Sequence, residues 1–335
     1  MKRIISLLLA LALSLSLAAC AAPAEKADGG KLQIVTTLFP YYDFARAIAQ
    51  DRADVTLLLS PGREAHSFEP TPLDAVTISE ADVFLYNGGE GEYWVESMLD
   101  AAGENIAVVA RMMDYVDALD EEYVEGMQGA DDHDHDHEHG SHDDHDHDHE
   151  EDEHDSDEIE YDEHIWTSPK NAVVLCRAVC DAICRADAEN AAFYRANCEN
   201  YCAQLEDLDA RFAALCESAP RRLLIFADRF PMLYFCREYG LDYRAAFHGC
   251  SGDTEPSLAT IKFLIDKVED ENIPVVYTID FGTKKVAAVV SECTGAAIET
   301  LYSMQTVSRA DFDAGETYLT LMERNFEALR KGLNA

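Results

Sequence analysis

The chain has 335 residues, of which 48% are apolar and 27% charged, and its formal net charge at pH 7 is −39. This length and apolar content are typical of about two domains, each with its own core. Because phosphate recognition needs a basic protein face, the acidic balance argues against nucleic acid as a partner and favours a cationic ligand.

The N-terminus predicts export and a lipid anchor. Two basic residues at 2–3 precede an apolar run over 4–17, which has the length of a signal peptide and is too short for a membrane-spanning helix. The run ends in LAAC, which is similar to the lipobox of bacterial lipoproteins; an ordinary secretory signal is the alternative. We therefore predict a lipoprotein signal peptide over 1–20, lipidation of Cys20, and a flexible tether over 21–30. The mature protein is then extracytoplasmic and anchored to the cell membrane.

The next part of the chain alternates short β-branched runs with helical patterns. Between the runs, apolar residues recur at three- and four-residue spacing. This alternation is typical of a parallel sheet with helices on its faces. The predicted strands are residues 32–38, 55–59, 82–87 and 105–110, and the predicted helices are residues 41–50, 72–81 and 92–103.

Residues 131–158 form an acidic segment rich in histidine. Residues 131–163 carry nineteen carboxylates and no Lys or Arg. The segment cannot bury enough apolar surface to order itself, so we predict a disordered loop over 129–160. Many weak imidazole sites would collect metal ions or sense them, without forming a preorganised site; a solubilising linker is the alternative. The accessory histidines are His133, His135, His137, His139, His142, His145, His147, His149 and His154.

After this loop the pattern is first helical and then returns to alternation. Residues 169–217 predict two helices broken near 186–190, and the second would be roughly 40 Å long at the standard rise per residue. The later strands and the last helix are predicted at 223–228, 243–249, 274–280, 296–303 and 315–333.

The predicted fold class is therefore α/β, with two lobes that each hold a parallel sheet of about four strands. A long rigid helix over 188–217 joins an N-terminal lobe over 31–187 to a C-terminal lobe over 218–335. In open parallel sheets ligands bind beyond the carboxyl ends of the strands, so two facing lobes predict a cleft there.

Nine cysteines follow Cys20, and five of them recur at helical spacing. Two packed helices could be bridged by disulfides in an exported protein. CxxxC is not the CxxC pattern of a structural zinc site, and most of these residues are expected to be small buried apolar side chains. The pairing stays open. The five are Cys176, Cys180, Cys184, Cys198 and Cys202.

Only three histidines lie outside the acidic loop. His66 follows the predicted strand 55–59, His164 precedes the first mid-chain helix, and His248 lies at the end of the predicted strand 243–249. All three are near the ends of predicted elements, where binding sites are built.

Three segments carry a family resemblance. They are PGREAHSFEPTPLDAVTISEADVFLYNGGEGEYW from residue 61, DEHIWTSPKNA from residue 162, and YLTLMERNFEAL from residue 318. Together they resemble the metal-binding lipoproteins (ZnuA- and AdcA-like, cluster A-I) of bacterial zinc and manganese ABC importers. The resemblance implies that His66 and His164 are metal ligands, and that a separate ABC permease and its ATPase subunit are partners.

The C-terminal lobe departs from the family pattern. Ala227 stands where the family usually has a histidine, in a subgroup marked by the DRFP run at 228–231. We predict Asp228 and Asp280 as the ligands from this lobe, with His248 and Glu255 as alternates. Cys250 is more simply explained as a packed cysteine.

Two imidazoles with one or two carboxylates suit Zn²⁺. Manganese is possible because the set is rich in oxygen, whereas Ca²⁺ and Mg²⁺ prefer all-oxygen shells. The predicted function is high-affinity extracytoplasmic Zn²⁺ binding and delivery to the permease for zinc uptake, by a monomer. A manganese-type binding protein and a surface zinc buffer or adhesin are the alternatives. A zinc hydrolase is disfavoured because HExxH and GxSxG motifs are missing, so no enzyme activity is expected.

Overall fold

The computed structural model describes residues 30–63, 68–128, 160–251 and 255–334. His66, Cys20 and the nine accessory histidines lie outside these ranges, as do the predicted signal peptide and almost all of the predicted tether and loop. The predictions about them therefore stay predictions.

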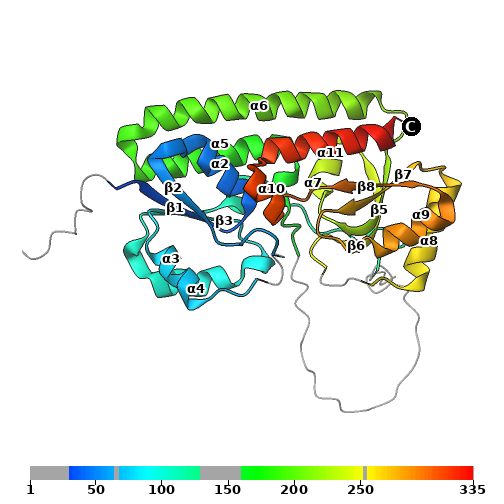
Figure 1. The fold of residues 1–335 in the computed structure, drawn as a ribbon, viewed down its shortest axis with the longest axis horizontal. Helices are drawn as coiled ribbons and strands as arrows, with labels where there is room; N and C mark the ends of the chain where they lie inside the picture. The colour runs from blue at the N-terminus through cyan, green and yellow to red at the C-terminus, as the bar shows by residue number, and fades with distance from the viewer. Residues whose placement is uncertain (1–29, 64–67, 129–159, 252–254, 335) are drawn as a thin grey trace, which may run out of the picture.

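Two four-stranded parallel sheets confirm the predicted fold class (Figure 1). Their strand orders, β2-β1-β3-β4 and β6-β5-β7-β8, are equivalent, and each reverses between its two central strands. Such a reversal opens a crevice at the carboxyl ends of the strands. The strands are β1 (Leu32–Thr36), β2 (Ala53–Leu57), β3 (Val83–Tyr86), β4 (Val108–Arg111), β5 (Leu223–Phe230), β6 (Asp242–His248), β7 (Val275–Ile279) and β8 (Ala297–Leu301).

The helices follow the predicted alternation, and local capping explains where several begin. The Thr71 and Thr317 side chains each close a capping box, and the Ser257 hydroxyl accepts a hydrogen bond from the backbone of Thr260. The strand predicted at 105–110 begins only at Val108, because residues 103–105 form a 3-10 turn. The lobe helices are α2 (Phe39–Ala49), α3 (Pro72–Ser79), α4 (Trp94–Ala102), α7 (Leu233–Tyr239), α8 (Leu258–Asp270), α9 (Lys285–Thr294), α10 (Arg309–Ala314) and α11 (Tyr318–Leu333).

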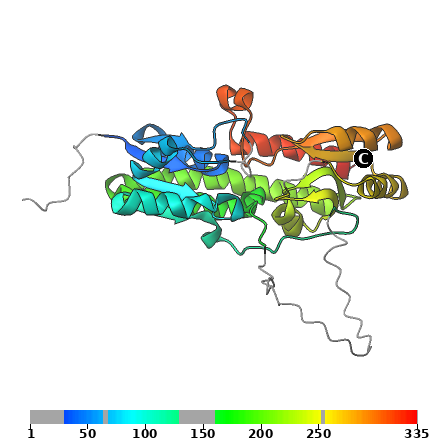
Figure 2. The ribbon, with the colours of Figure 1, turned by 90° about the horizontal axis from the view of Figure 1, so that it is seen from below.

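The two mid-chain helices are α5 (Pro169–Ala186) and α6 (Ala191–Ser218), with the predicted break between them. At about 1.5 Å per residue, α6 is roughly 42 Å long. It packs against α2 and α5 on the first lobe and against α7 and α11 on the second (Figures 1 and 2). The helix is therefore a shared support for both lobes. Among the described helices, none combines the length and apolarity that crossing a lipid bilayer would require.

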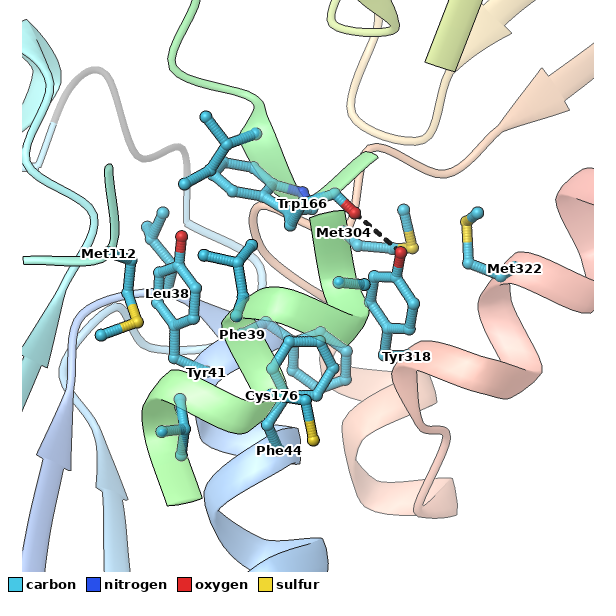
Figure 3. Close-up of a cluster of buried hydrophobic side chains, with 14 of the residues drawn as sticks. Leu38, Phe39, Tyr41, Phe44, Met112, Trp166, Cys176, Met304, Tyr318 and Met322 are labelled. Carbon is cyan, nitrogen blue, oxygen red and sulfur yellow. Dashed lines mark hydrogen bonds between the residues drawn. The ribbon is translucent and has the colours of Figure 1, made fainter. Parts of the chain in front are cut away.

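One hydrophobic core runs through both lobes. It joins buried side chains from the first sheet, such as Ile34, to others from the second, such as Tyr277. Where the lobes meet, Trp166 Nε1 donates to Ser303 O (2.7 Å) and Tyr318 Oη donates to Trp166 O (2.7 Å; Figure 3). Because the core is continuous, wide separation of the lobes would expose large aromatic surfaces to water.

Candidate metal centre

The segment before α5 is held by both lobes. Asn87, directly after β3, donates from Nδ2 to the backbone oxygen of Glu163 (2.9 Å), and Gly91 N donates to Oε1 of the same residue (2.7 Å). From the second lobe, Tyr234 Oη donates to Asp162 O (2.8 Å). These bonds place the segment at the carboxyl edge of the first sheet, facing the second lobe.

His164 lies in this segment with 1% of its side chain exposed. Its Nδ1 is 3.0 Å from Asp162 Oδ1, which also accepts a hydrogen bond from its backbone N–H (2.7 Å). A proton held at Nδ1 by a carboxylate leaves the lone pair on Nε2, the arrangement found in metal-binding histidines. Burial lowers the pKa of His164, but the charge and hydrogen bond of Asp162 outweigh it and raise the pKa above its ordinary value.

The turn after β6 packs directly on this ring. A Cβ at Gly249 would lie 3.1 Å from both Cε1 and Nδ1 of His164 and 2.9 Å from Phe230 O. Only a residue without a side chain allows this approach without displacing backbone. The turn that follows His248 on the second lobe is therefore in contact with His164.

Glu121 is the close partner of His248. Its Oε1 lies 3.0 Å from His248 Nδ1 and accepts a hydrogen bond from Cys250 N (3.2 Å), and its side chain is 4% exposed. The His248 Nδ1 atom is buried and makes no aligned hydrogen bond within the described residues. A nitrogen and an oxygen that approach closely without alignment can instead both face a shared cation.

Electrostatics keeps Glu121 ionised. Burial raises the pKa of its carboxyl group. The contact with His248 and the hydrogen bond from the Cys250 N–H lower that pKa by a larger amount, so it lies below its ordinary value. Burial and the charges of Glu121 and Glu163 raise the pKa of the Cys250 thiol, so this cysteine keeps its proton. The backbone of Cys250, not its sulfur, is therefore the part that contacts Glu121.

The two predicted aspartate ligands lie at the carboxyl edge of the second sheet. Asp228 accepts hydrogen bonds from Arg229 N (2.9 Å) and Ile279 N (3.4 Å), and Asp280 accepts one from Ser303 N (3.2 Å). Both side chains thus hold backbone at the ends of β5, β7 and β8.

The two remaining positions of the second lobe lie elsewhere. Glu255 is on the surface, 77% exposed, where it pairs with Lys285 at 3.1 Å. Ala227, at the position of the family's usual histidine, is buried in a hydrophobic cluster of the second lobe. The structure therefore places Gly249, the residue after the alternate His248, against His164 at the lobe boundary.

Sequence reasoning missed Glu121 and the role of Asp162. Asp162 stands two residues before His164, and that proximity could have suggested an orienting carboxylate. Glu121 follows the first sheet in a stretch without a motif, and His248 lies 127 positions later in the sequence. No local pattern could have revealed it.

Glu92 is a further buried carboxylate at the carboxyl edge of the first sheet. Its Oε2 accepts a hydrogen bond from Gly88 N (2.8 Å). Burial raises its pKa to about 7, with hydrogen bonds from Thr37 and Gly88 opposing the rise and the charge of Glu163 adding to it. Glu92 therefore titrates near neutral pH.

Comparisons with known proteins show the family of the chain. The family model described as "ZnuA: Zinc-uptake complex component A periplasmic" matches residues 34–332. The chain is similar to the high-affinity zinc uptake system protein ZnuA of Bacillus subtilis (strain 168), with 32% identity over 91% of this chain and 88% of that protein. It is 30% identical to the zinc-binding lipoprotein AdcA of Streptococcus pneumoniae, over 99% of this chain but only 61% of the length of AdcA.

A solved structure extends the likeness to the fold. The crystal structure of the Zn(II)-bound ZnuA-like domain of Streptococcus pneumoniae AdcA superposes with a TM-score of 0.71 and 26% identity. The match covers 91% of this chain and all of that domain. The two-lobe arrangement is thus shared with a domain that was crystallised with zinc.

Proposed function

We propose that this chain, which belongs to the ZnuA family of periplasmic zinc-uptake components, captures Zn²⁺ outside the cytoplasmic membrane and delivers it to an ABC permease. The observation that carries the proposal is the packing of Gly249 on the buried ring of His164 at the boundary between the lobes; Gly249 directly follows His248, whose partner in space is Glu121. Two imidazoles and a carboxylate form a donor set that suits Zn²⁺ better than Ca²⁺ or Mg²⁺.

The proposed first ligands are His164, His248 and Glu121, with His66 as the fourth. Asp162 orients His164, and the buried Nδ1 of His248 is an unsatisfied atom that a cation would satisfy. Asp228 and Asp280 remain ligands predicted from the sequence. Their hydrogen bonds to backbone support a bracing role at the edge of the second sheet.

The release of Zn²⁺ to the permease would depend on which parts of the fold hold the ligands. His164 is held by Asn87 and Tyr234 through its neighbours, whereas His248 ends a strand of the second sheet. A small relative tilt of the lobes would part the two imidazoles and weaken the site. The shared core and α6 oppose a wider separation of the two lobes. A permease that binds both lobes could therefore release the ion with a limited movement.

The remaining features support the same role outside the membrane. The predicted lipobox at Cys20 would anchor the protein to the membrane, as the name of the pneumococcal lipoprotein relative suggests. The nine histidines of the acidic loop would raise the local zinc concentration by repeated weak binding. We propose that the protein works as a monomer with one permease and one ATPase partner.

A competitive zinc and manganese titration of the mature chain tests the proposal. His164→Ala, His248→Ala and Glu121→Gln are each expected to weaken zinc binding by more than about 100-fold, beyond the 10–100-fold typical of outer residues. Glu255→Gln, on an exposed side chain, is the matched control and should bind as the parent does. Equal zinc affinity in the His164 variant and the parent would refute the site.

Two further arms of the titration separate the remaining possibilities. Asp228→Asn and Asp280→Asn test the ligands predicted from the sequence, and losses as large as those of His248→Ala would move the site to the second sheet. Deletion of residues 131–158 should remove weak equivalents and keep the tight one. Loss of all tight zinc with this loop would make the protein a buffer. Tighter binding of Mn²⁺ than of Zn²⁺ would favour the manganese alternative.

A further inference from the structure

A second set of side chains of the kind that bind metals lies outside the region of the histidines, between α5 and α6. These two helices pack side by side (Figure 1). Five cysteines fill part of their interface, and each is no more than 7% exposed. They are Cys176, Cys180 and Cys184 on α5, and Cys198 and Cys202 on α6.

Three of these sulfurs form a compact triangle. The Sγ atoms of Cys176, Cys198 and Cys202 all lie within 4.8 Å of one another, and those of Cys198 and Cys202 are 3.8 Å apart. In a tetrahedral site with Zn–S bonds of about 2.3 Å, neighbouring sulfurs are about 3.8 Å apart. The side chains are therefore spaced almost as a bound ion would require.

We propose that Cys176, Cys198 and Cys202 form a closed thiolate site for Zn²⁺, with Cys180 as the fourth ligand. Each helix supplies two cysteines at i and i+4, which lie on one helical face. Two such pairs facing each other surround a point with four sulfurs, although neither pair has the CxxC spacing of a zinc knuckle. This site is separate from the interlobe centre and does not depend on the proposed function.

The fourth sulfur is within reach. Cys180 stands one turn after Cys176 on α5, and its Sγ is 4.0 Å from that of Cys184. Interaction with Cys198 raises the pKa of the Cys180 thiol, so these two thiols are near each other across the helix interface. Cys198 is thus the central residue, because it touches Cys176, Cys180 and Cys202.

The surroundings lower the pKa of one thiol of the group and raise the pKa of the other three, Cys176, Cys180 and Cys202. Hydrogen bonds from Cys176 and Cys180 lower the pKa of Cys198, and the nearby Arg177 guanidinium acts in the same direction. Its positive charge would offset part of the excess negative charge of four thiolates around one Zn²⁺. Two of these thiols donate hydrogen bonds to helix carbonyls, Cys198 to Cys176 O (3.8 Å) and Cys202 to Val173 O (3.9 Å). On metal binding both thiols would lose their protons to solvent.

Disulfide formation is the alternative to metal binding for these cysteines. Cys198 and Cys202 stand one turn apart on the same helix, where disulfide geometry is poor, so a bridge would have to join the two helices. A bridge would consume two thiols and leave the triangle incomplete. Metal binding uses all the sulfurs without any oxidant.

The test uses cobalt(II) as a spectroscopic probe and measures tightly bound zinc. The mature chain carries Cys250→Ser, so that no thiol remains at the interlobe centre. Cys198→Ala and Cys202→Ala remove the central sulfurs, and Cys216→Ala is the matched control, a buried cysteine on the same α6 helix but outside the group. Circular dichroism verifies that each variant is folded.

We expect the parent and Cys216→Ala to show intense cobalt–thiolate charge-transfer absorption and one zinc equivalent that resists chelation. Both features should be lost in Cys198→Ala and Cys202→Ala. The remaining cysteines of these two variants should react with an alkylating agent when the protein is unfolded in the presence of chelator. Three results would overturn the proposal. They are no charge-transfer absorption in the folded parent, an unchanged spectrum in Cys198→Ala, or a parent mass lower by two hydrogen atoms per cysteine pair.

Discussion

At the scale of single residues, the orientation of His164 depends on one carboxylate. Asp162 Oδ1 accepts hydrogen bonds from both the ring and the backbone of His164, in a site with almost no solvent contact. Such an outer carboxylate selects the tautomer and strengthens the ring as a ligand. The identity of the metal-binding nitrogen is therefore decided by a residue that does not itself need to touch the ion.

Replacement of Asp162 by Asn tests this role. The amide can still accept one hydrogen bond but carries no charge, so zinc affinity should fall about tenfold, the lower end of the range for outer residues. Competition calorimetry measures the change, with the exposed Asp117→Asn as the control of identical chemistry. An affinity equal to that of the parent would show that Asp162 does not tune His164.

Glu92 predicts a pH dependence of stability. Its pKa is about 7 in the folded protein and 4.5 ordinarily, so the folded state binds the proton more tightly than the unfolded chain does. The resulting loss of stability is absent below pH 4.5, grows as the pH rises, and is complete above pH 7. A shift of this size corresponds to roughly 3 kcal/mol.

The Glu92→Gln variant should therefore be more stable than the parent above pH 7, by up to about 3 kcal/mol. The difference should vanish below pH 4.5, where both side chains are neutral. Denaturant unfolding across a pH series, in chelator, measures it. Glu90→Gln, on an exposed side chain two residues away, should show no such pH-dependent gain. A constant difference at all pH values would contradict the assigned titration.

At the scale of elements, one buried side chain of α2 joins it to two other helices. Asp43 Oδ2 accepts hydrogen bonds from Tyr201 Oη on α6 (2.6 Å) and from Tyr318 N at the start of α11 (2.9 Å). A carboxylate at a helix N-terminus is favoured by the helix dipole. Burial raises the pKa of Asp43, and the two hydrogen bonds oppose that rise. The three helices thus share one acceptor.

Asp43→Ala should destabilise the protein by about 3 kcal/mol, because two buried donors lose their acceptor. Tyr201→Phe removes only one of these bonds and should cost about 1 kcal/mol. Urea unfolding with the exposed Asp51→Ala as control distinguishes the loss of this junction from a general effect of removing an aspartate. Equal stability of Asp43→Ala and the control would show that the junction contributes nothing.

At the scale of the whole molecule, the proposed zinc site and the shared core act on the same boundary. His164 and His248 reach it from different lobes, and Trp166 and Tyr318 are hydrogen-bonded to each other beneath it. An ion bound by both histidines would therefore hold the lobes together in addition to the core. Ligand binding to the folded state alone stabilises that state by mass action.

Free zinc at 100 times its dissociation constant should stabilise the mature chain by about 2.7 kcal/mol. For a protein of this size, with an unfolding entropy of about 2.1 cal/mol/K per residue, that corresponds to a rise in melting temperature of roughly 4 °C. Differential scanning calorimetry should show the rise in the parent and in the protein lacking residues 131–158. His164→Ala should lose it. Stabilisation that disappears with the loop would place the binding energy there instead.

Much of the fold was predictable because the burial of a helix or strand shows in the spacing of apolar residues in its own sequence. All eight strands and the break before α6 were found from apolar spacing, since each element must turn one face or both toward a core. On the last helix, four apolar residues of one face are buried, namely Tyr318, Leu321, Met322 and Leu329, while Phe326 on the same face is only partly covered. The short α10 has no comparable pattern, because a helix of six residues presents too little surface to show a period.

By itself the sequence determined the α/β class, the order of the elements and the family resemblance, and it predicted His164 as a metal ligand. Only the tertiary structure decided which segments surround His164. Gly249, which packs on its ring, is 85 residues away in the sequence, and Glu121, the partner of the neighbouring His248, is 43 residues away. Periodicity reports which face of an element is buried, but it carries no information on which distant element covers that face.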